Sequence, residues 1–518
     1  MSLNHAALLE ESARRYPAKA AIISEDQKLS YAELNRLANK FANALQGLGV
    51  TPGDKVALML PNVPYFPICY YGILKLGAVV VPLHFLFKGA EVGRCLRDSD
   101  SVALVAGDDF VEEAGEGFAE AGGCRHLIVI NPLGRTALPE GALSLEALMA
   151  EASPAFNIKQ TAPDDTASIL YTSGTMGRPK GIEWTHFSLL VHAQALVRDV
   201  LKATPDDAFL TAVPLCLGIG HMALNFAVYA GASNTLLPRF EPQKALEAIQ
   251  RDRVTITSGV PTVYVRLLNY QDADRYDLTS LRLCRSGGAP MPIEVMKAFE
   301  EKYEGAIILQ TYGLSEGMTV ASDVPGRPRK PGSVGLPLPG VELRIVDDED
   351  NEVVQGELGE LVVRSPTMMK GYHKRPDATA EVLRHGWLHT GDIGYVDEDG
   401  YLFVVGRKDD AILRGGHNIY PREIEEVLYG HPAIAEAAVL GMPDPDLGKE
   451  VKAFVTLKDG YQISEEDIIA FCRERLAAYK YPRHVEILST MPKSSSGKIL
   501  KKRLRDSTHG GAKPQEIT

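Results

Sequence analysis

Residues 167–181 read ASILYTSGTMGRPKG, an apolar strand pattern that runs directly into a loop rich in glycine and hydroxyl groups. Glycines let backbone N–H groups approach a phosphate closely, and the hydroxyls and Lys180 add further donors. The GK[ST] sequence of a Walker A loop is absent, so this is not the loop of a P-loop nucleotidase. The stretch therefore predicts a phosphate-binding loop after a sheet strand. On composition alone, a structural glycine-rich turn is the alternative.

Strand patterns of the same kind recur on both sides of this loop and alternate with helix patterns. We expect strands at Lys55–Leu60, Gly77–Pro82, Ser101–Ala106, His126–Ile130 and Ala208–Val213. Leu29–Leu48 repeats apolar residues at a spacing of three to four and is followed by Gly49, which predicts a helix. Such alternation indicates parallel sheets covered by helices, an α/β fold.

After Gly332 the pattern changes to short alternating strands separated by turn residues. Strands of a small β-rich subdomain are expected at Gly340–Val346, Glu360–Arg364 and Tyr401–Val405. Further on, we expect a helix at Pro421–Tyr429, strands at Ala435–Met442 and Glu450–Leu457, and a helix at Ser464–Leu476. The predicted organisation is an N-terminal domain over residues 1–408, with two α/β sheet subdomains and the β-rich one, and a small mobile α+β domain over residues 409–518.

Bulk composition narrows the class of protein. With 518 residues, 45% of them hydrophobic and 24% charged, the chain is typical of a globular protein of more than one domain. The sequence shows neither an apolar run long enough for an integral membrane segment nor the profile of a secretory signal, so a cytoplasmic enzyme is expected. The net charge of −12 disfavours nucleic acid as a partner. The six cysteines lack metal-binding spacing and are expected to be buried free thiols.

Six further motifs follow the loop at 171–181 in order along the chain. They are SGGAP at 286–290, QTYGLSE at 310–316, GWLHTGD at 386–392, GRKDD at 406–410, RGGHNIYP at 414–421 and PKSSSGK at 492–498. Together these motifs resemble the acyl-adenylate-forming superfamily, which includes acyl-CoA synthetases, nonribosomal peptide adenylation domains and firefly luciferases. The resemblance runs from about Leu29 to Arg505. It implies that a carboxylic acid reacts with ATP and Mg²⁺ to give an acyl-adenylate, and that coenzyme A then takes the acyl group.

The resemblance also implies roles for individual residues. Lys498 would be the catalytic cation, and Glu316 with Thr175 would be catalytic and would hold the Mg²⁺. The residues expected to bind nucleotide, acyl group or CoA are Thr172, Ser173, Gly174, Thr175, Met176, Gly177, Lys180, Gly287, Gly288, Ala289, Pro290, Gln310, Thr311, Tyr312, Gly313, Ser315, Asp392, Arg407, Gly415, Gly416 and Lys498. Tyr312 would stack on adenine and Asp392 would accept the ribose hydroxyls. The C-terminal domain would swing about Asp409, exchanging the Lys498 face for the Gly415–Gly416 loop.

Some positions depart from the family pattern. Met176 and Ser315 each stand where threonine is common, and Leu217 stands where many relatives have a histidine near the acyl and CoA channels. We interpret His221, beside Gly220, as structural. Gly218, Gly220 and Ala223 are expected to open an acyl channel.

The acid is expected to be a medium- or long-chain fatty acid, because the amino-acid sequence of the motifs most resembles that of bacterial fatty-acyl-CoA ligases. The alternatives are an aryl-acid CoA ligase of the benzoate or coumarate type, a stand-alone adenylation enzyme that loads a carrier protein, and, more remotely, a noncatalytic nucleotide-binding relative. Homodimer formation is left open.

Overall fold

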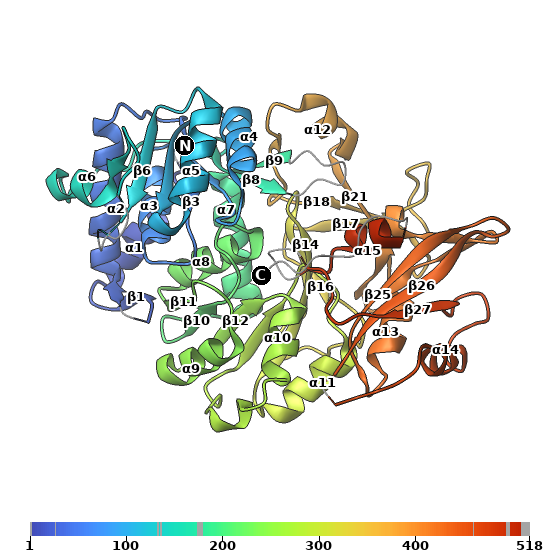
Figure 1. Cartoon of the computed structure of the whole chain (residues 1–518). Coiled ribbons are helices and arrows are strands. Elements are labelled where there is room, and N and C mark those ends of the chain that lie inside the picture. The colour runs from blue at the N-terminus through green and yellow to red at the C-terminus, as the bar shows by residue number, and fades with distance from the viewer. Residues whose placement is uncertain are drawn as a thin grey trace.

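The computed structural model describes residues 3–25, 27–131, 134, 137–172, 180–458, 460–493 and 498–508. Its mixed α/β architecture confirms the expected fold class: a large N-terminal domain of sheets and a small C-terminal domain, drawn in orange to red in Figure 1. In the described ranges, no helix combines the length and apolarity needed to cross a membrane. All six cysteines are free thiols, and all but the partly exposed Cys124 are buried.

One sheet of the N-terminal domain has eight strands in the order β19-β9-β8-β4-β3-β5-β6-β7. Their bounds are β3 Lys55–Met59, β4 Val79–Pro82, β5 Ser101–Gly107, β6 His126–Ile130, β7 Leu143–Ser144, β8 Thr166–Thr172, β9 Lys180–Thr185 and β19 Gly371–Tyr372. The strands from β8 to β7 in this order pair in parallel, whereas β8 and β9 form an antiparallel pair. Buried strands of this kind need apolar residues on both faces. This is why the segments that were predicted as strands and that form β3, β4, β5 and β6 are continuous apolar runs in the sequence.

The second sheet has nine strands in the order β16-β15-β14-β13-β12-β10-β11-β1-β2. Their bounds are β1 Ala20–Ile23, β2 Lys28–Ser30, β10 Ala208–Thr211, β11 Ser233–Leu236, β12 Ile256–Gly259, β13 Leu283–Ser286, β14 Ile307–Leu314, β15 Met318–Ser322 and β16 Leu336–Pro337. One face packs on α7 (His186–Ala195) and α8 (Gly218–Ala230). The other packs on α9 (Pro242–Asp252), α10 (Pro261–Leu268) and α11 (Ile293–Lys302).

Helices near the N-terminus cover the first sheet and the junction between the two sheets (Figure 1). They are α1 Ala7–Arg15, α2 Tyr31–Gly47, α3 Tyr65–Lys75, α4 Gly89–Ser99, α5 Val111–Ala121 and α6 Leu145–Glu151. The predicted start of the second helix at Leu29 is wrong, because Leu29 pairs with Ile22 in the sheet. Ser30 is instead the N-cap: its Oγ accepts the Glu33 N–H at 3.2 Å, and the Glu33 carboxylate accepts the Ser30 N–H at 2.8 Å.

The last third of the chain forms two smaller sheets. The β-rich sheet contains β17 Glu342–Val346, β18 Gly359–Arg364, β20 Leu383–Arg384, β21 Trp387–Val396 and β22 Leu402–Arg407, with α12 (Pro376–Val382) alongside. The C-terminal sheet contains β23 Ile412–Arg414, β24 His417–Ile419, β25 Ile434–Asp444, β26 Gly448–Leu457 and β27 His484–Ile487. Helices α13 (Pro421–Tyr429) and α14 (Glu465–Arg473) share its apolar core, and α15 (Lys501–Thr508) contacts β25. The exact boundary at residues 408 and 409 stays a prediction.

The start of α8 shows what its glycines do. A Cβ added to Gly220 would lie 2.2 Å from the Pro214 carbonyl oxygen, whereas one added to Gly218 would find its nearest neighbour, Trp184 Cη2, at 3.6 Å. Gly220 is therefore required by the close approach of α8 to the preceding turn, and its expected part in an acyl channel stays a prediction.

We expect Gly220→Ala to lower the free energy of unfolding by about 1–3 kcal/mol, because backbone atoms must move to admit the methyl group. Gly218→Ala is the matched control and should leave the melting temperature nearly unchanged, since its Cβ would make an ordinary contact. Thermal unfolding of the two variants side by side checks this. Equal melting temperatures would contradict the packing argument.

Candidate active site

The carboxyl ends of β13 and β14 bring two of the sequence motifs together. These strands are parallel and pair Ser286 with Gln310, so the loops that follow them lie side by side. Thr311 Oγ1 donates to the Ser286 carbonyl at 3.0 Å, and a Cβ on Gly287 would lie 2.6 Å from that hydroxyl. Gly288 has a φ of +80°, which favours glycine. Such an edge of an open α/β sheet is where ligands bind.

Asp392 stands at the centre of a second contact set. The Tyr312 hydroxyl donates to Asp392 Oδ2 at 2.6 Å, which ties β14 to β21. Arg407, the register partner of Asp392 on β22, places Nη1 3.3 Å from Asp392 Oδ1 and 3.0 Å from the Thr390 carbonyl. Burial raises the pKa of Asp392, and the charge of Arg407 and the bond from Tyr312 oppose that rise. Three motifs thus meet around one buried carboxylate.

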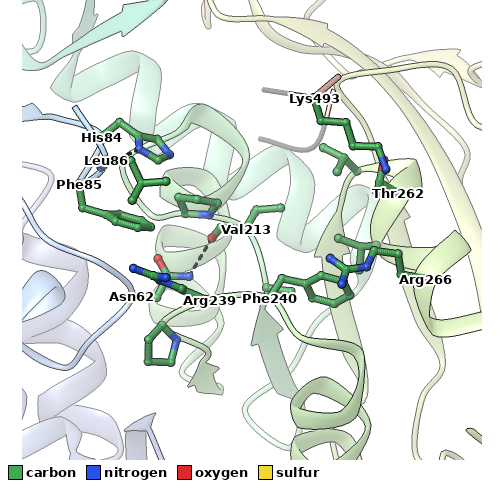
Figure 2. Close-up of a pocket in the computed structure, with 15 residues that line it drawn as sticks. Asn62, His84, Phe85, Leu86, Val213, Arg239, Phe240, Thr262, Arg266 and Lys493 are labelled. Carbon is green, nitrogen blue, oxygen red and sulfur yellow. Dashed lines mark hydrogen bonds between the residues drawn. The ribbon is translucent and has the colours of Figure 1, made fainter. Parts of the chain in front are cut away.

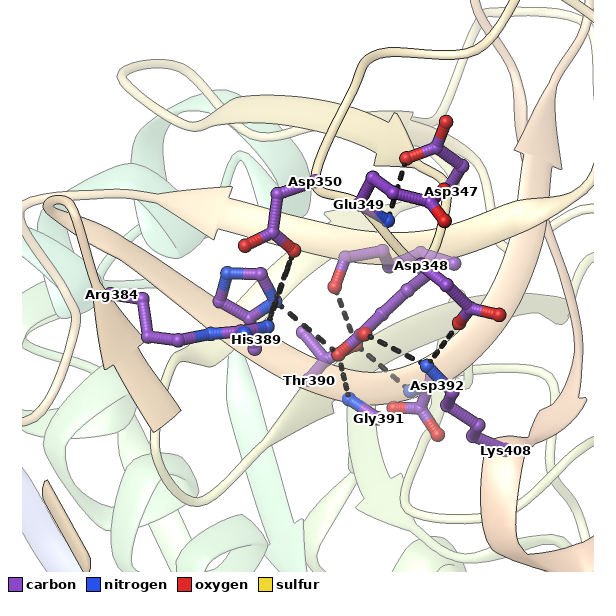
Figure 3. Close-up of polar contacts among 12 residues, drawn as sticks. Asp347, Asp348, Glu349, Asp350, Arg384, His389, Thr390, Gly391, Asp392 and Lys408 are labelled. Carbon is purple, nitrogen blue, oxygen red and sulfur yellow. Dashed lines mark hydrogen bonds and ion pairs between the residues drawn. The ribbon is translucent and has the colours of Figure 1, made fainter. Parts of the chain in front are cut away.

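The backbone around Asp392 is held by a polar network, drawn in Figure 3. Thr390 Oγ1 accepts the Asp392 N–H at 3.0 Å, and Glu360 Oε1 accepts the Gly391 N–H at 3.1 Å. Lys408 Nζ lies 2.7 Å from Asp348 and 3.8 Å from Glu360. Lys408 is the last residue before the predicted hinge at Asp409, so these ion pairs hold the end of the N-terminal domain against the β-rich sheet.

Lys498 reaches this cluster from the far end of the chain. A Cβ on Gly288 would lie 3.3 Å from Lys498 Cε and 3.7 Å from its Nζ. The residue as a whole is exposed, but its ammonium end is largely withdrawn from water, which lowers the pKa of Lys498. The negative charge of Asp392 opposes this lowering and the positive charge of Arg407 adds to it. The structure therefore brings together four residues from four separate motifs, called the reaction cluster below: Lys498, Gly288, Asp392 and Arg407.

Glu316 and Lys180 meet on either side of Tyr372, a residue that no motif identified. The Tyr372 hydroxyl donates to Glu316 Oε1 at 2.8 Å, and Lys180 Nζ lies 4.7 Å from the centre of the Tyr372 ring. Burial and the Glu316 charge raise the pKa of Tyr372. In the described ranges there is no group of three His, Cys, Asp or Glu side chains that could hold a metal. A single carboxylate nonetheless fits Mg²⁺, which usually binds one or two carboxylates together with substrate phosphates.

The predicted phosphate-binding loop lies largely outside the described residues. Ser173, Gly174, Thr175, Met176 and Gly177 fall there, so the predicted pairing of Thr175 with Glu316 has no structural description. The ends of the loop are described: Thr172 closes β8 and pairs with Lys180 at the start of β9. The loop therefore begins and ends at neighbouring positions beside Tyr372.

Other predicted residues are placed by single contacts. The Gln310 N–H donates to Asp323 Oδ2 at 2.9 Å, and burial raises the pKa of Asp323 to about 6. The Ser315 carbonyl accepts the Trp184 Nε1–H at 2.8 Å, and a Cβ on Gly313 would lie 2.1 Å from the Met318 carbonyl. Ala289 is partly exposed and Pro290 exposed in the loop after Gly288. Sequence reasoning missed Asp323, Trp184 and Tyr372, because isolated residues outside glycine-rich motifs carry no local signal.

Gly415 and Gly416 do not join the cluster. They form the turn between β23 and β24 with φ of +55° and +83°, and the Gly415 N–H donates to the Leu447 carbonyl at 3.0 Å. The two strands and the Leu447 carbonyl all belong to the C-terminal domain. In this arrangement Lys498 faces the motifs that contain Gly288 and Asp392, while the glycine turn lies elsewhere.

Leu217 and His221 occupy the first part of α8. Leu217 is the N-cap residue, and His221 is buried with its ring 4.8 Å from that of Tyr70 and 5.5 Å from that of Trp184. Burial lowers the pKa of His221 to about 3, so the imidazole is neutral at physiological pH. This environment agrees with its interpretation as a structural residue.

A cavity of about 370 Å³ opens between the ends of the two large sheets (Figure 2). It is lined by Asn62, His84, Phe85, Leu86, Ala212, Val213, Pro214, Pro238, Arg239, Phe240, Val260, Thr262, Val263, Arg266 and Lys493. Its wall is continuous with the reaction cluster, since Gly259, next to Val260, accepts the Gly287 N–H at 3.1 Å. Lys493 pairs with Glu436 at 2.6 Å, whereas Arg239 and Arg266 have no carboxylate partner in the part of the chain that the structure describes.

Comparison with known proteins gives two family matches. The model of the AMP-binding enzyme family matches residues 9–373, and that of the AMP-binding enzyme C-terminal domain matches residues 423–498.

Individual relatives span nearly the whole chain. The chain is 37% identical to a long-chain-fatty-acid–CoA ligase of Bacillus subtilis (strain 168), over 96% of this chain and 93% of the relative. It is 36% identical to a feruloyl-CoA synthase of Amycolatopsis sp, over 95% and 96% respectively. Among solved structures, the anthranilate CoA ligase AuaEII in complex with anthranoyl-AMP matches with a TM-score of 0.92 and 33% identity, over 98% of this chain and 97% of that one.

Proposed function

Because this chain belongs to the AMP-binding enzyme family, and relatives similar to it are named as CoA ligases, we propose that it joins an organic acid to coenzyme A at the expense of ATP, releasing AMP and pyrophosphate. The observation that carries the proposal is the position of Lys498. Its ammonium lies at Gly288, close enough to Asp392 and Arg407 for their charges to act on its pKa.

In the first half-reaction, a carboxylate oxygen of the acid attacks the α-phosphorus of ATP. The bond from that phosphorus to the pyrophosphate oxygen breaks, and pyrophosphate leaves with its electron pair. Lys498 stabilises the negative charge on the α-phosphoryl oxygens in the transition state. Asp392 accepts hydrogen bonds from the ribose hydroxyls, with its carboxylate oriented by Tyr312 and Arg407. When bound, Mg²⁺ neutralises charge on the phosphates, and Glu316 together with Thr175 would hold it.

In the second half-reaction, the CoA thiol, after losing its proton, attacks the acyl carbonyl and the bond to AMP breaks. We propose that domains 1–408 and 409–518 rotate about Asp409 between the half-reactions, so that Gly415 and Gly416 replace Lys498 at the site. The position of Lys498 and the separate position of the glycine turn support an adenylation arrangement in this structure.

The cavity lined by Arg239 and Arg266 is the proposed CoA site. CoA combines a slender pantetheine arm with phosphate groups, and the cavity combines apolar walls with cationic side chains. The guanidinium carbon of Arg266 lies 5.4 Å from the centre of the Phe240 ring. Stacking of this kind leaves the N–H groups at the edge of the guanidinium available for phosphate oxygens.

Arg239→Ala is expected to raise the KM for CoA about tenfold, the effect of losing one exposed charge-assisted contact. ATP–pyrophosphate exchange should be unchanged, because adenylation needs no CoA. Arg253→Ala removes another exposed arginine, paired with Asp277 away from this cavity, and serves as the control. An unchanged KM for CoA in Arg239→Ala would contradict the assignment.

For the acid, the proposal is an aliphatic one of the medium- or long-chain fatty acid type. The name of the Bacillus relative and the apolar character of α8, which begins beside the reaction cluster, support this. Aryl acids are the second candidate, supported by the names of the feruloyl-CoA synthase and the anthranilate CoA ligase. A carrier protein is the alternative acceptor of the acyl group in place of CoA. For the oligomeric state, a homodimer is the alternative to a monomer.

Pyrophosphate release with a panel of acids, with and without CoA, tests the function. The proposal expects acid-dependent release, and formation of a CoA thioester when CoA is present. Release without any thioester would indicate carrier loading instead. No release with any acid would overturn the proposal in favour of a nucleotide-binding protein without catalysis.

A further inference from the structure

Arg285 is a buried arginine close to the reaction cluster. It lies on β13 and is 3% exposed. Its Nη2 donates to Thr319 Oγ1 at 2.8 Å, and its guanidinium carbon lies 5.7 Å from the centre of the Phe226 ring on α8. Its Nε and Nη1 have no hydrogen-bond partner among the residues that the structure describes.

No carboxylate of the described chain compensates this charge. The guanidinium contacts the Thr319 hydroxyl and the Phe226 ring, and His192 Nε2 lies 3.0 Å from Thr319 Oγ1. The buried Tyr264 hydroxyl donates to the Arg285 carbonyl at 2.7 Å. Burial lowers the pKa of Arg285 to about 10, and burial together with the Arg285 charge lowers that of His192 to about 3. A buried charge without a counter-ion is destabilising, so its presence calls for a partner from outside the chain.

The position of Arg285 relative to the reaction cluster is fixed by the backbone. It precedes Gly288 by three residues, so their α carbons are at most about 10 Å apart. On the facing helix, Ile219 Cδ1 would lie 3.1 Å from a Cβ on Gly288, and Phe226 contacts Arg285. Seven residues of helix separate Ile219 from Phe226, about 10 Å. Arg285 therefore lies about two helical turns along α8 from the point where Lys498 meets Gly288.

A further polar atom without a partner lies in the same layer between α8 and the sheet. Ser258 pairs in register with Arg285 on the neighbouring parallel strand, so both side chains point to the α8 face. The Ser258 hydroxyl has no partner in the described ranges. A layer built only for a hydrocarbon chain would leave all of these polar groups unsatisfied.

We propose that Arg285 binds a second carboxylate at the distal end of the acid, so that the substrate class is a dicarboxylic acid of short to medium chain. One carboxylate reacts beside Lys498 and the other pairs with the free Nε and Nη1 edge of the guanidinium, which suits bidentate recognition. This inference rests on the proposed ligase function and departs from the fatty acid proposed above, because it gives the aliphatic chain a second, distal carboxylate. It predicts that an unsubstituted fatty acid of the same length leaves Arg285 unpaired and reacts more slowly.

The test compares chain-matched pairs of acids on the wild-type chain and on Arg285→Met. Each pair consists of a linear dicarboxylic acid and the corresponding monocarboxylic acid, over about three to eight carbons, the span set by the backbone separation of Arg285 and Gly288. The measured quantity is kcat/KM for CoA-thioester formation. The wild type is expected to favour the dicarboxylic acid at least about tenfold at its best length. Arg285→Met should lose about 100-fold on that acid while keeping or gaining activity on the monocarboxylic partner.

Arg285→Lys is the conservative control and should retain part of the preference, because it keeps the charge without the bidentate geometry. Arg285→Met should fold, since replacing a buried unpaired charge by an apolar group is often neutral or stabilising, and its melting temperature checks this. A wild type that prefers monocarboxylic acids, or an Arg285→Met variant with an unchanged ratio, would overturn the inference and leave the ligase function intact. Absence of pyrophosphate release with every acid would refute the ligase function itself.

Discussion

Lys498→Ala is expected to reduce ATP–pyrophosphate exchange by about 10³-fold while sparing thioester formation from presynthesised acyl-adenylate. The reason is that the ammonium at Gly288 acts on charge that develops only when the α-phosphorus is attacked. The second half-reaction is proposed to use another face of the C-terminal domain, so it does not need this cation. Exchange of labelled pyrophosphate into ATP and thioester formation from purified acyl-adenylate measure the two steps separately.

The control for this substitution is Lys502→Ala, which removes an exposed lysine of α15 and should leave both half-reactions unchanged. The pH dependence gives a second readout. Since burial lowers the pKa of Lys498, its charge is lost at a lower pH than for an ordinary lysine, and exchange should fall on the alkaline side. Undiminished exchange in Lys498→Ala would remove Lys498 from the mechanism.

Asp392→Asn is expected to weaken ATP binding by about 10- to 100-fold and, unlike Lys498→Ala, to impair both half-reactions. The carboxylate offers two acceptor oxygens to the ribose hydroxyls, whereas an amide offers one acceptor and one donor. The amide would also meet Arg407 without a counter-charge, because Arg407 Nη1 lies 3.3 Å from Asp392 Oδ1. The KM for ATP and the rate with acyl-adenylate and CoA are the quantities to measure.

Asp399→Asn provides the matched comparison, since Asp399 is an exposed aspartate that pairs with Lys330 at a nearby turn. It should leave the KM for ATP unchanged. If Asp392→Asn binds ATP as tightly as the wild type does, the proposed ribose-binding role of Asp392 is refuted. Its role would then be to hold β21 against β14 through the hydrogen bond from Tyr312.

The sequence predicts much of the fold because its signals are local. Apolar runs such as His126–Ile130 correspond to buried parallel strands, and the helix expected at Pro421–Tyr429 has those bounds in the structure. The predicted start of α2 is wrong, because a capping box at Ser30 and strand pairing of Leu29 outweigh helical periodicity. The packing role of Gly220 could not be predicted for a similar reason: it depends on the Pro214 carbonyl, which periodicity does not place, and the expected acyl channel stays a prediction.

The sequence by itself determined which motifs the candidate site can draw on and their order along the chain. Each motif is a short segment of glycine, hydroxyl and charged residues, so it can be found from neighbouring residues alone. Only the tertiary structure decided which of them meet. Lys498 lies beside Gly288 and Asp392, whereas Gly415 and Gly416 do not, because the packing of the C-terminal domain sets those distances. That Arg285 has no carboxylate partner in the described ranges is likewise decided only by the tertiary structure. An arginine in a strand pattern looks ordinary, and whether its charge has a partner depends on side chains that folding brings from distant segments.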